Sequence, residues 1–357
     1  MPTATPLRPR AAGRSSDQRE LSSAGSKAFP HHGKANAWVS TVTITQTPRD
    51  EALGGYRHEA FLYSGRTEFV SGTMSFIRQA VSAGDPILVV VSGDKLDLLR
   101  RELGADAGKA TFADMGRVGG NPARIIAAWQ AFVAAHAGAR QLWGIGEPVH
   151  PERSPTELAE CQLHEALLNV AFDAATPFWL LCPYDLEALA ADVIDEAQRT
   201  HPFIARVDRR QASGGFRLID LADPFDRPVP ARPADAATMS FQIGRLRRVR
   251  AFVAAQATHA GLDPESTAAM VLAVTEIATN SLRYGGGHGE LCAWVRDGSL
   301  VCEVSDRGHI TSPLVGRVQP VLDGQGGAGL WVANQLCDLV QIFSSPRGTT
   351  VRVYQDI

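Results

Sequence analysis

The sequence predicts an α/β protein in which a doubly wound, mostly parallel sheet is followed by a separate α/β sandwich. Between residues 55 and 205, short and continuously apolar runs alternate with helical segments, as they do in sheets whose strands are buried on both faces. A proline-rich segment ends this alternation, and beyond it a long amphipathic helix precedes a hairpin and several glycine-bearing turns. At 357 residues, the chain also exceeds the length at which one hydrophobic core usually suffices.

The composition indicates packed cores and excludes several classes of protein. Hydrophobic residues make up 45% of the chain, and a net charge of −3 argues against a general nucleic-acid-binding protein. The five cysteines form no C-x-x-C pair, which excludes the usual zinc spacing and fits a reduced, cytoplasmic protein. No apolar run reaches about 18 residues and the N-terminus has no apolar signal core, so we expect no membrane association.

The first part of the chain is predicted to be a tail and one α/β domain. Residues 1–50 are rich in Pro, Ala, Gly, Ser and Thr, and we expect a disordered tail because so little apolar surface cannot offset the ordering entropy. The domain is placed at residues 51–210. Its strands are predicted at residues 86–92, 110–115, 141–147 and 178–184, and its helices at 67–83, 94–103, 122–137, 155–174 and 185–199.

This order of elements resembles the MEDS sensory domain, a RecA-like module that lacks a phosphate loop. The H-x-x-x-x-Y motif of that family corresponds to the segment from His58 to Tyr63. The resemblance implies a domain that senses a small organic molecule, with His58, Tyr63 and Cys161 as candidates to line the pocket. A surface or capping role for His58 is the alternative.

A second histidine, His164, lies in the run QLHEALLNVAF, which superficially resembles the phosphoacceptor box of histidine kinases. Such a box normally lies on a helical hairpin just before the ATPase domain, whereas His164 lies inside the α/β domain. We therefore expect a histidine on the surface of a helix. The zinc motif H-E-x-x-H is also excluded, because Leu168 stands where its second histidine would be.

Residues 211–237 are predicted to be a linker, because four prolines fall between Pro224 and Pro233. The run FRLIDL at its start is interpreted as a short strand. The second domain is placed at residues 238–357, and its first helix is expected to begin at Phe241 with arginines on its outer side. The apolar residues expected to face inward are Ile243, Leu246, Val249, Phe252 and Val253.

The next helix carries the residues on which the functional prediction depends. Asp263 and Pro264 are a typical N-cap and first-turn proline, after a helix that ends at Gly261. Further along, Glu276 and Asn280 lie four residues apart, on the side opposite an apolar stripe. Two solvated surface residues would show the same pattern.

Later elements complete a sheet backed by helices. The runs LCAWVR and LVCEVS flank an Asp-Gly pair at residues 297–298, which is a strong signal for a two-residue hairpin turn. Residues 311–325 are expected to form a short flexible lid. A last antiparallel pair is expected to turn at residues 346–348, and the sheet as a whole is expected to be mixed.

Three glycine-bearing turns in this region predict a nucleotide pocket. A glycine turn that opens a helix, as at residues 326–330, presents free N–H groups to phosphate. Asp306, in the turn Asp306-Arg307-Gly308, can accept a hydrogen bond from an exocyclic amine, and the amide oxygen of Asn280 suits Mg²⁺. The third turn is residues 348–350. The chain contains neither a Walker sequence nor a Rossmann fingerprint.

The order of motifs, E-x-x-x-N, D-x-G, G-x-G-L and G-T-T, resembles the GHKL ATPase fold and, within it, the anti-sigma factor serine kinases. The resemblance covers about the last 120 residues. It implies that ATP and Mg²⁺ bind here. The implied roles are Glu276 as general base, Asn280 as Mg²⁺ ligand, Asp306 with Gly308 at the adenine, Gly327, Gly329 and Leu330 at the lid and phosphate turn, and Thr349 near the adenine.

One departure from the family is that Ile310 replaces the second glycine of a common D-x-G-x-G form, which puts the local turn in question. The resemblance implies a regulator that phosphorylates a serine of an anti-anti-sigma partner, binds a sigma factor, or does both, and it implies a homodimer. The sequence leaves two alternatives open. One is a sensor histidine kinase, and the other is an ATP-gated module that binds a sigma factor without transferring phosphate.

Overall fold

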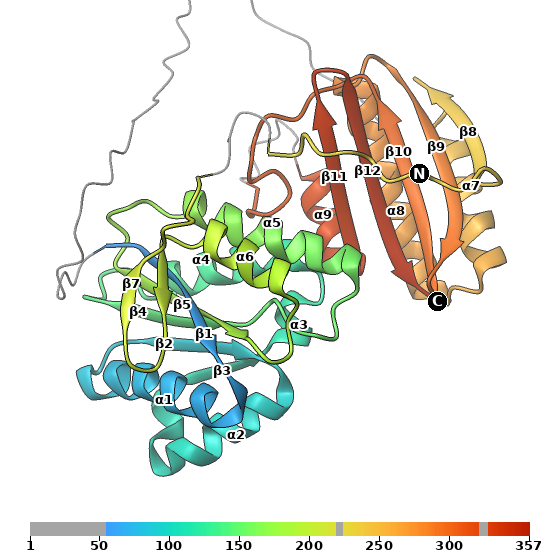
Figure 1. Ribbon diagram of the computed structural model, residues 1–357. Helices are drawn as coiled ribbons and strands as arrows, with labels where there is room; N and C mark the ends of the chain where they lie inside the picture. Colours follow the sequence, from blue (N-terminus) through green and yellow to red (C-terminus); the bar gives the residue numbers. More distant parts are fainter. Residues whose placement is uncertain (1–54, 219–223, 321–327) are drawn as a thin grey trace, which may run out of the picture. The chain divides into compact units, whose positions relative to one another are not determined.

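The computed structural model describes residues 55–218, 224–320 and 328–357. The predicted tail at residues 1–50 and the predicted phosphate-turn residue Gly327 lie outside this part of the chain. Residues 48–357 group into one unit, and the described residues within it form two sheets (Figure 1).

The first sheet has seven strands in the order β3-β2-β4-β5-β1-β6-β7. All neighbours pair in parallel except β6 and β7, so the predicted mostly parallel sheet is confirmed. The strands are β1 Arg57–Tyr63, β2 Ile87–Val91, β3 Thr111–Asp114, β4 Leu142–Gly146, β5 Phe178–Asp185, β6 Phe203–Ala205 and β7 Arg210–Ala212.

Helices cover both faces of this sheet, as the alternating pattern predicted (Figure 1). One apolar core lies between the sheet and α1 and α2, and a second lies between the sheet and α4, α5 and α6. The helices and turns are α1 Gly65–Ala83, α2 Gly93–Leu103, η1 Gly104–Lys109, α3 Met115–Gly119, η2 Pro122–Arg124, α4 Ile125–Ala135, α5 Pro155–Ala171 and α6 Ala191–Thr200. The helix predicted to begin at residue 185 begins six residues later, because β5 continues to Asp185.

Strand β1 was not predicted, although it lies inside the sheet between β5 and β6. Its sequence RHEAFLY contains charged residues, yet Glu59 is fully buried. Arg57 and Arg210 both form ion pairs with the Glu59 carboxylate, and they offset part of the cost of burying its charge. Arg57 is the first residue of β1 itself and Arg210 lies on β7, so apolar periodicity alone did not reveal this strand.

The second sheet has five strands in the order β11-β12-β10-β9-β8, and all its pairs are antiparallel. The prediction of a mixed sheet was therefore wrong in this detail. The strands are β8 Ala237–Gln242, β9 His288–Arg296, β10 Ser299–Asp306, β11 Leu339–Ser345 and β12 Gly348–Asp356. The Asp-Gly turn is confirmed, because Asp297 and Gly298 have φ values of 49° and 81°, as a primed hairpin turn requires.

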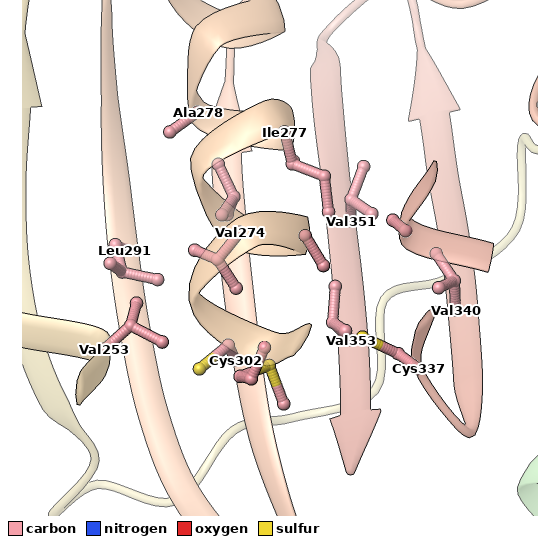
Figure 2. Packing of buried hydrophobic residues seen from close by; sticks show 14 of the residues in the cluster. Val253, Val274, Ile277, Ala278, Leu291, Cys302, Cys337, Val340, Val351 and Val353 are labelled. Carbon is pink, nitrogen blue, oxygen red and sulfur yellow. The ribbon is translucent and has the colours of Figure 1, made fainter. Parts of the chain in front are cut away.

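Three helices pack on this sheet: α7 Leu246–Ala260, α8 Pro264–Tyr284 and α9 Gly329–Leu336. Figure 2 shows Val274 and Ile277 of α8 facing Leu291, Val351 and Val353 of the strands. Together with the first sheet, this arrangement confirms the predicted fold class.

The predicted start of α8 is confirmed, whereas the predicted start of α7 is wrong. The Asp263 carboxylate accepts hydrogen bonds from the N–H groups of Glu265 and Ser266, so the predicted cap of α8 is confirmed. The helix expected to begin at Phe241 begins at Leu246 instead, because Phe241 belongs to β8. Ile243, expected to face inward, is 73% exposed.

The predicted linker, residues 211–237, is bounded by strands. β7 ends at Ala212 and β8 begins at Ala237. Residues 216–218 of the run FRLIDL form no strand, and residues 219–221 lie outside the described residues. Phe225 is fully buried in the core of the second sheet, and its carbonyl accepts a hydrogen bond from the N–H of Ser344. Part of the proline-rich segment is therefore packed.

Candidate nucleotide-binding site

Helix α8 presents Glu276 and Asn280 on the side away from its buried stripe. Met270, Val274 and Ile277 on that stripe are at most 3% exposed, whereas Glu276 and Asn280 are only half-buried. The α8 core therefore fixes the orientation of the carboxylate and the amide.

The first residue of α9, Gly329, lies against these two side chains. A β-carbon at Gly329 would lie 2.9 Å from the Asn280 Nδ2 and 3.4 Å from the Glu276 Oε2. The 2.9 Å contact is tighter than a side chain tolerates without displacement, so the close approach depends on glycine. The structure thus brings together Glu276, Asn280 and Gly329, three of the residues singled out in the sequence.

Asp306, Gly308 and Thr349 form a second group, where β10 meets β12. Asp306 is the last residue of β10 and pairs with Thr349 across the ladder. The Gly308 N–H donates to Asp306 Oδ1 at 2.6 Å, and the Thr349 hydroxyl donates to the Gly308 carbonyl at 2.9 Å. These bonds hold the turn and orient the Asp306 carboxylate.

Ile310 stands where the common D-x-G-x-G form has its second glycine, and hydrogen bonds still hold the turn in place. The Ile310 N–H donates to Ser344 Oγ at 2.8 Å, and Ser344 Oγ lies 2.7 Å from Thr349 Oγ1. The hydrogen bonds therefore run from residue 310 through two buried hydroxyl groups back to the carbonyl of Gly308.

Gly285 connects the two groups, and the sequence reasoning did not single it out. It follows the last residue of α8, and a β-carbon there would lie 2.3 Å from the Asp306 Cγ. Its φ of −99° is ordinary, so the position requires glycine for space and not for backbone conformation. Asn280 precedes Gly285 by five residues, which is about 7.5 Å along the helix axis. The glycine run at residues 285–287 was the available signal.

Two further predictions concern Leu330 and the lid expected at residues 311–325. Leu330 is 5% exposed and belongs to the core, so it anchors α9. In the described part of the predicted lid, Arg317 is 2% exposed, and its Nη2 lies 2.6 Å from Glu160 Oε2 on α5. This part of the predicted lid is therefore packed at Arg317.

The C-terminal end of α9 receives donors from η2. Arg124 donates through Nε to the Asn334 carbonyl at 2.6 Å and through Nη2 to the Cys337 carbonyl at 2.8 Å. The Asn121 amide donates to the same two carbonyls at 3.2 Å. A cation at the carbonyl end of a helix is favourable, so α9 is held at one end by η2 and lies against Glu276 and Asn280 at the other.

The candidate residues for a sensory pocket do not lie together. Tyr63 borders a cleft of about 450 Å³ at the carboxyl ends of the strands, which Lys95 and Asp185 also line. His58 instead contacts Glu165, and the Cys161 thiol donates to the Pro148 carbonyl at 3.2 Å.

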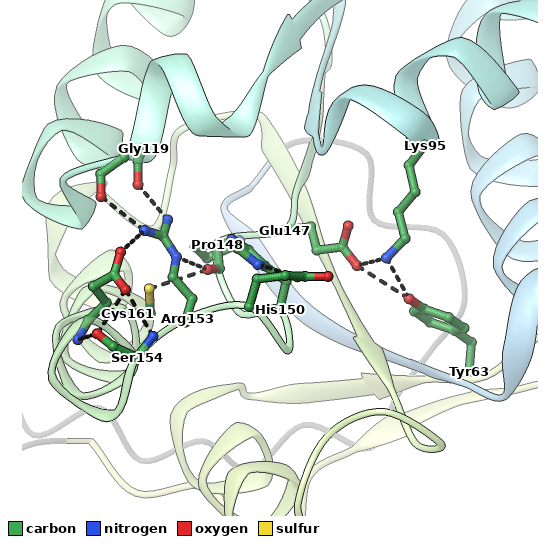
Figure 3. Close-up of polar contacts among 12 residues, drawn as sticks. Tyr63, Lys95, Gly119, Glu147, Pro148, His150, Arg153, Ser154 and Cys161 are labelled. Carbon is green, nitrogen blue, oxygen red and sulfur yellow. Dashed lines mark hydrogen bonds and ion pairs between the residues drawn. The ribbon is translucent and has the colours of Figure 1, made fainter. Parts of the chain in front are cut away.

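Tyr63 belongs to a polar network with Lys95 and Glu147, which Figure 3 shows on the opposite side of the view from Cys161. The Lys95 ammonium donates to the Tyr63 hydroxyl at 2.9 Å and pairs with the Glu147 carboxylate, and the Tyr63 hydroxyl donates to Glu147 at 3.3 Å. Burial raises the pKa of Glu147, and the Lys95 charge opposes that rise. Lys95 and Glu147 are polar groups beside the cleft, and neither belongs to a recognisable catalytic motif in the sequence.

The expectation that His164 lies on the surface of α5 was wrong. Its side chain is 1% exposed, and burial lowers its pKa to about 3. A phosphoacceptor must reach the γ-phosphate of a nucleotide, so this position does not suit that role.

The family comparisons agree with the two resemblances. Residues 57–202 match the family described as the methanogen/methylotroph, DcmR sensory domain (MEDS), and residues 239–354 match the histidine kinase-like ATPase domain. The sequence matches none of the curated proteins with which it was compared. None of the described helices is long and apolar enough to cross a membrane.

Two of the matching solved structures cover the chain only in part. The RsbU and RsbW domains of Rv1364c from Mycobacterium tuberculosis are 21% identical over 35% of this chain and 32% of that chain, with a TM-score of 0.26. The histidine kinase AdeS from Acinetobacter baumannii is 11% identical over 34% of this chain and 67% of that chain, with a TM-score of 0.20. The match spans about a third of the first protein, and neither similarity assigns an activity.

Proposed function

We propose that this chain, which carries a MEDS domain at residues 57–202 and a histidine kinase-like ATPase domain at residues 239–354, is a signal-responsive protein serine kinase. It would bind Mg-ATP and phosphorylate a serine of a partner of the anti-anti-sigma type. The observation that carries the proposal is the convergence of Glu276, Asn280 and Gly329. A carboxylate, an amide and a glycine at a helix start are together suited to phosphoryl transfer from ATP.

Each residue has a role that its surroundings support. The Asn280 side-chain oxygen would ligate Mg²⁺, and the absence of a side chain at Gly329 lets the first turn of α9, with its free N–H groups, lie close to it. Gly308 orients Asp306 through Oδ1, and we assign Oδ2 to the amine of adenine. The Mg-ATP supplies the phosphoryl group, while the chain contributes position and charge.

Glu276 would act as the general base. It lies one helical turn before Asn280, and it is half-buried, so a serine hydroxyl of a partner can approach it. Its carboxylate would accept the hydroxyl proton as the oxygen attacks the γ-phosphate.

The N-terminal domain would supply the signal. The cleft beside Tyr63 and Lys95 has polar walls and the size for a small organic molecule. Asn121 and Arg124 bind the carbonyl end of α9, so a change in the N-terminal domain can reach the helix that touches Glu276 and Asn280.

A second candidate function is an ATP-gated binding module that holds a sigma factor without transferring phosphate. Four arginines of or just before α7 are exposed, and Ile243 beside them is 73% exposed, which suits an acidic partner protein. The arginines are Arg245, Arg247, Arg248 and Arg250. The histidine kinase alternative loses the one phosphoacceptor box that the sequence suggested, because His164 is buried.

Phosphate transfer from γ-labelled ATP to proteins of the native lysate tests the proposal. The wild type should give an acid-stable label on serine, and Glu276→Gln should abolish it while ATP affinity stays unchanged. Glu265→Gln, an exposed carboxylate of the same helix, is the matched control and should label normally. Labelling that persists in the Glu276→Gln variant would disprove the role of Glu276 as general base. Nucleotide binding without any labelled protein favours the binding module, and an acid-labile label favours a histidine kinase.

Equilibrium dialysis with ATP tests the nucleotide site itself. Asn280→Ala should remove the dependence of ATP affinity on Mg²⁺ and leave the weaker, Mg²⁺-free affinity nearly unchanged. If the wild type binds no adenine nucleotide, the proposed function is refuted as a whole.

A further inference from the structure

Four side chains from four elements of the N-terminal domain converge in its core. They are His58 on β1, Glu165 on α5, Cys182 on β5 and His201 at the end of α6. One ligand atom of each lies within 4.8 Å of the corresponding atom of every other. All four residues are at most 1% exposed.

The hydrogen bonds around the two histidines determine where their protons lie. His201 Nδ1 is 2.8 Å from the Ala197 carbonyl, which can only accept, so Nδ1 carries the proton. His58 Nδ1 is 3.2 Å from Asn169 Oδ1, and the amide group of Asn169 is turned so that its nitrogen donates to the Thr200 carbonyl at 2.7 Å. Both neutral imidazoles therefore direct the lone pair of Nε2 into the cluster.

These lone pairs face a carboxylate without a group between them. The Nε2 atoms of His58 and His201 are 3.0 and 3.2 Å from the same oxygen, Glu165 Oε2. Two lone pairs directed at one carboxylate oxygen repel it unless a cation or a proton lies between them. His201 Nε2 and Glu165 Oε1 also have no hydrogen-bond partner, although both atoms are buried.

We propose that His58, Glu165, Cys182 and His201 bind one divalent transition-metal ion of the zinc class. A tetrahedral zinc site with bonds of about 2.0–2.3 Å has edges of about 3.3–3.6 Å between its ligand atoms. Three of the six separations, 3.0, 3.2 and 3.5 Å, the last from Cys182 Sγ to His58 Nε2, are close to these values, and the other pairs lie within 4.8 Å. The donor set of one thiolate, two imidazoles and one carboxylate suits such an ion.

The charges of the cluster also favour a cation. A divalent ion, the Glu165 carboxylate and the Cys182 thiolate sum to zero, which a buried site tolerates better than an isolated carboxylate. The thiol proton of Cys182 would leave to solvent when the ion binds.

Protonation of both histidines would place two positive charges beside one carboxylate in the core. Such a buried cluster would carry a net positive charge, which the core tolerates less well than a neutral one.

Four protein ligands leave no open position for water or substrate, so the site would be structural. It would join the strands β1 and β5 to the helices α5 and α6. The ligands are separated by 107, 17 and 19 positions in the sequence, so they form no local motif of the kind by which zinc sites are usually recognised.

The test uses the untagged full-length chain and measures metal by mass spectrometry. We expect about one equivalent of metal after purification, or after unfolding with a chelator and refolding with Zn²⁺. Refolding with Co²⁺ should give the visible absorption of a tetrahedral site and a thiolate-to-cobalt charge-transfer band. Wild-type protein that refolds but binds neither Zn²⁺ nor Co²⁺ would overturn the proposal and leave a hydrogen-bonded cluster.

Two cysteine variants identify the thiolate. Cys182→Ser should lose the charge-transfer band, whereas Cys161→Ser should keep it, since Cys161 is equally buried in the same core but contacts Pro148. The opposite pattern would refute the assignment. If Cys182→Ser does not fold, the Co²⁺ spectrum of Cys161→Ser remains as the test. A charge-transfer band in Cys161→Ser must come from a thiol other than Cys161, and loss of the band would refute the assignment to Cys182.

Asn169→Ala provides a test that leaves every ligand in place. Removing the group that orients His58 should weaken the affinity for Zn²⁺ by about 10- to 100-fold. An unchanged affinity would contradict the tautomer on which the site depends.

Discussion

Replacement of Gly285 by alanine should displace the Asp306 carboxylate and weaken nucleotide binding. The added β-carbon would lie 2.3 Å from Asp306 Cγ and 2.5 Å from Oδ1, whereas carbon atoms in contact are normally about 3.5–4.0 Å apart. The backbone of Asp306 is held in the ladder with β12, so the carboxylate is the group that can move.

The expected size of the effect follows from these contacts. The overlap should cost about 1–3 kcal/mol of stability, as overpacked sites commonly do. A lost hydrogen bond between adenine and a carboxylate is worth about 1.5–3 kcal/mol. The dissociation constant for ATP should therefore rise by about 10- to 150-fold.

Titration calorimetry with ATP measures the change, and thermal unfolding shows whether the variant is folded. Gly214→Ala is the control, because a β-carbon there meets nothing within 4 Å. Asp306→Asn combined with Gly285→Ala should bind no more weakly than Asp306→Asn alone, since both changes remove the same contact. A folded Gly285→Ala variant with unchanged affinity would refute the assignment of Asp306 to adenine.

Three further predictions concern stability and reactivity. Glu303→Gln leaves the guanidinium of Arg352, which is 2% exposed and bound at 2.7 Å, without its carboxylate, and urea unfolding should show a loss of about 3–5 kcal/mol. A loss below about 1 kcal/mol would contradict this. Hydrogen bonds from Ser154 and the charge of Arg153 outweigh burial and lower the pKa of Glu157 from 4.5. Its stabilising contribution is therefore present above pH 4.5 and is lost as the pH falls through the lower folded pKa. Glu157→Gln should flatten the dependence of melting temperature on pH in that range, and an unchanged slope would count against it. Burial raises the pKa of Cys302 and of Cys337 to about 12, so a thiol reagent at pH 8 should modify neither before unfolding.

Local patterns accounted for much of the ATPase domain. The Asp-Gly hairpin, the Asp263 cap and the apolar stripe of α8 depend on residues a few positions apart, and the structure has all three. The motif order also pointed to Glu276, Asn280 and Gly329, which the structure places together. Their catalytic and binding roles remain predictions, and Gly327 lies outside the described residues.

The sequence therefore determined many of the elements, their alternation and the residues to which the two family resemblances pointed, because these follow from short-range periodicity and turn chemistry. It did not determine which polar residues are buried, because burial depends on partners far along the chain. Glu59 is buried beside Arg210, Asp306 is packed by Gly285, and His58 meets Glu165 across 107 positions. Only the pairing of β1 with β5 and the packing of α5 on that face brought the last two side chains together.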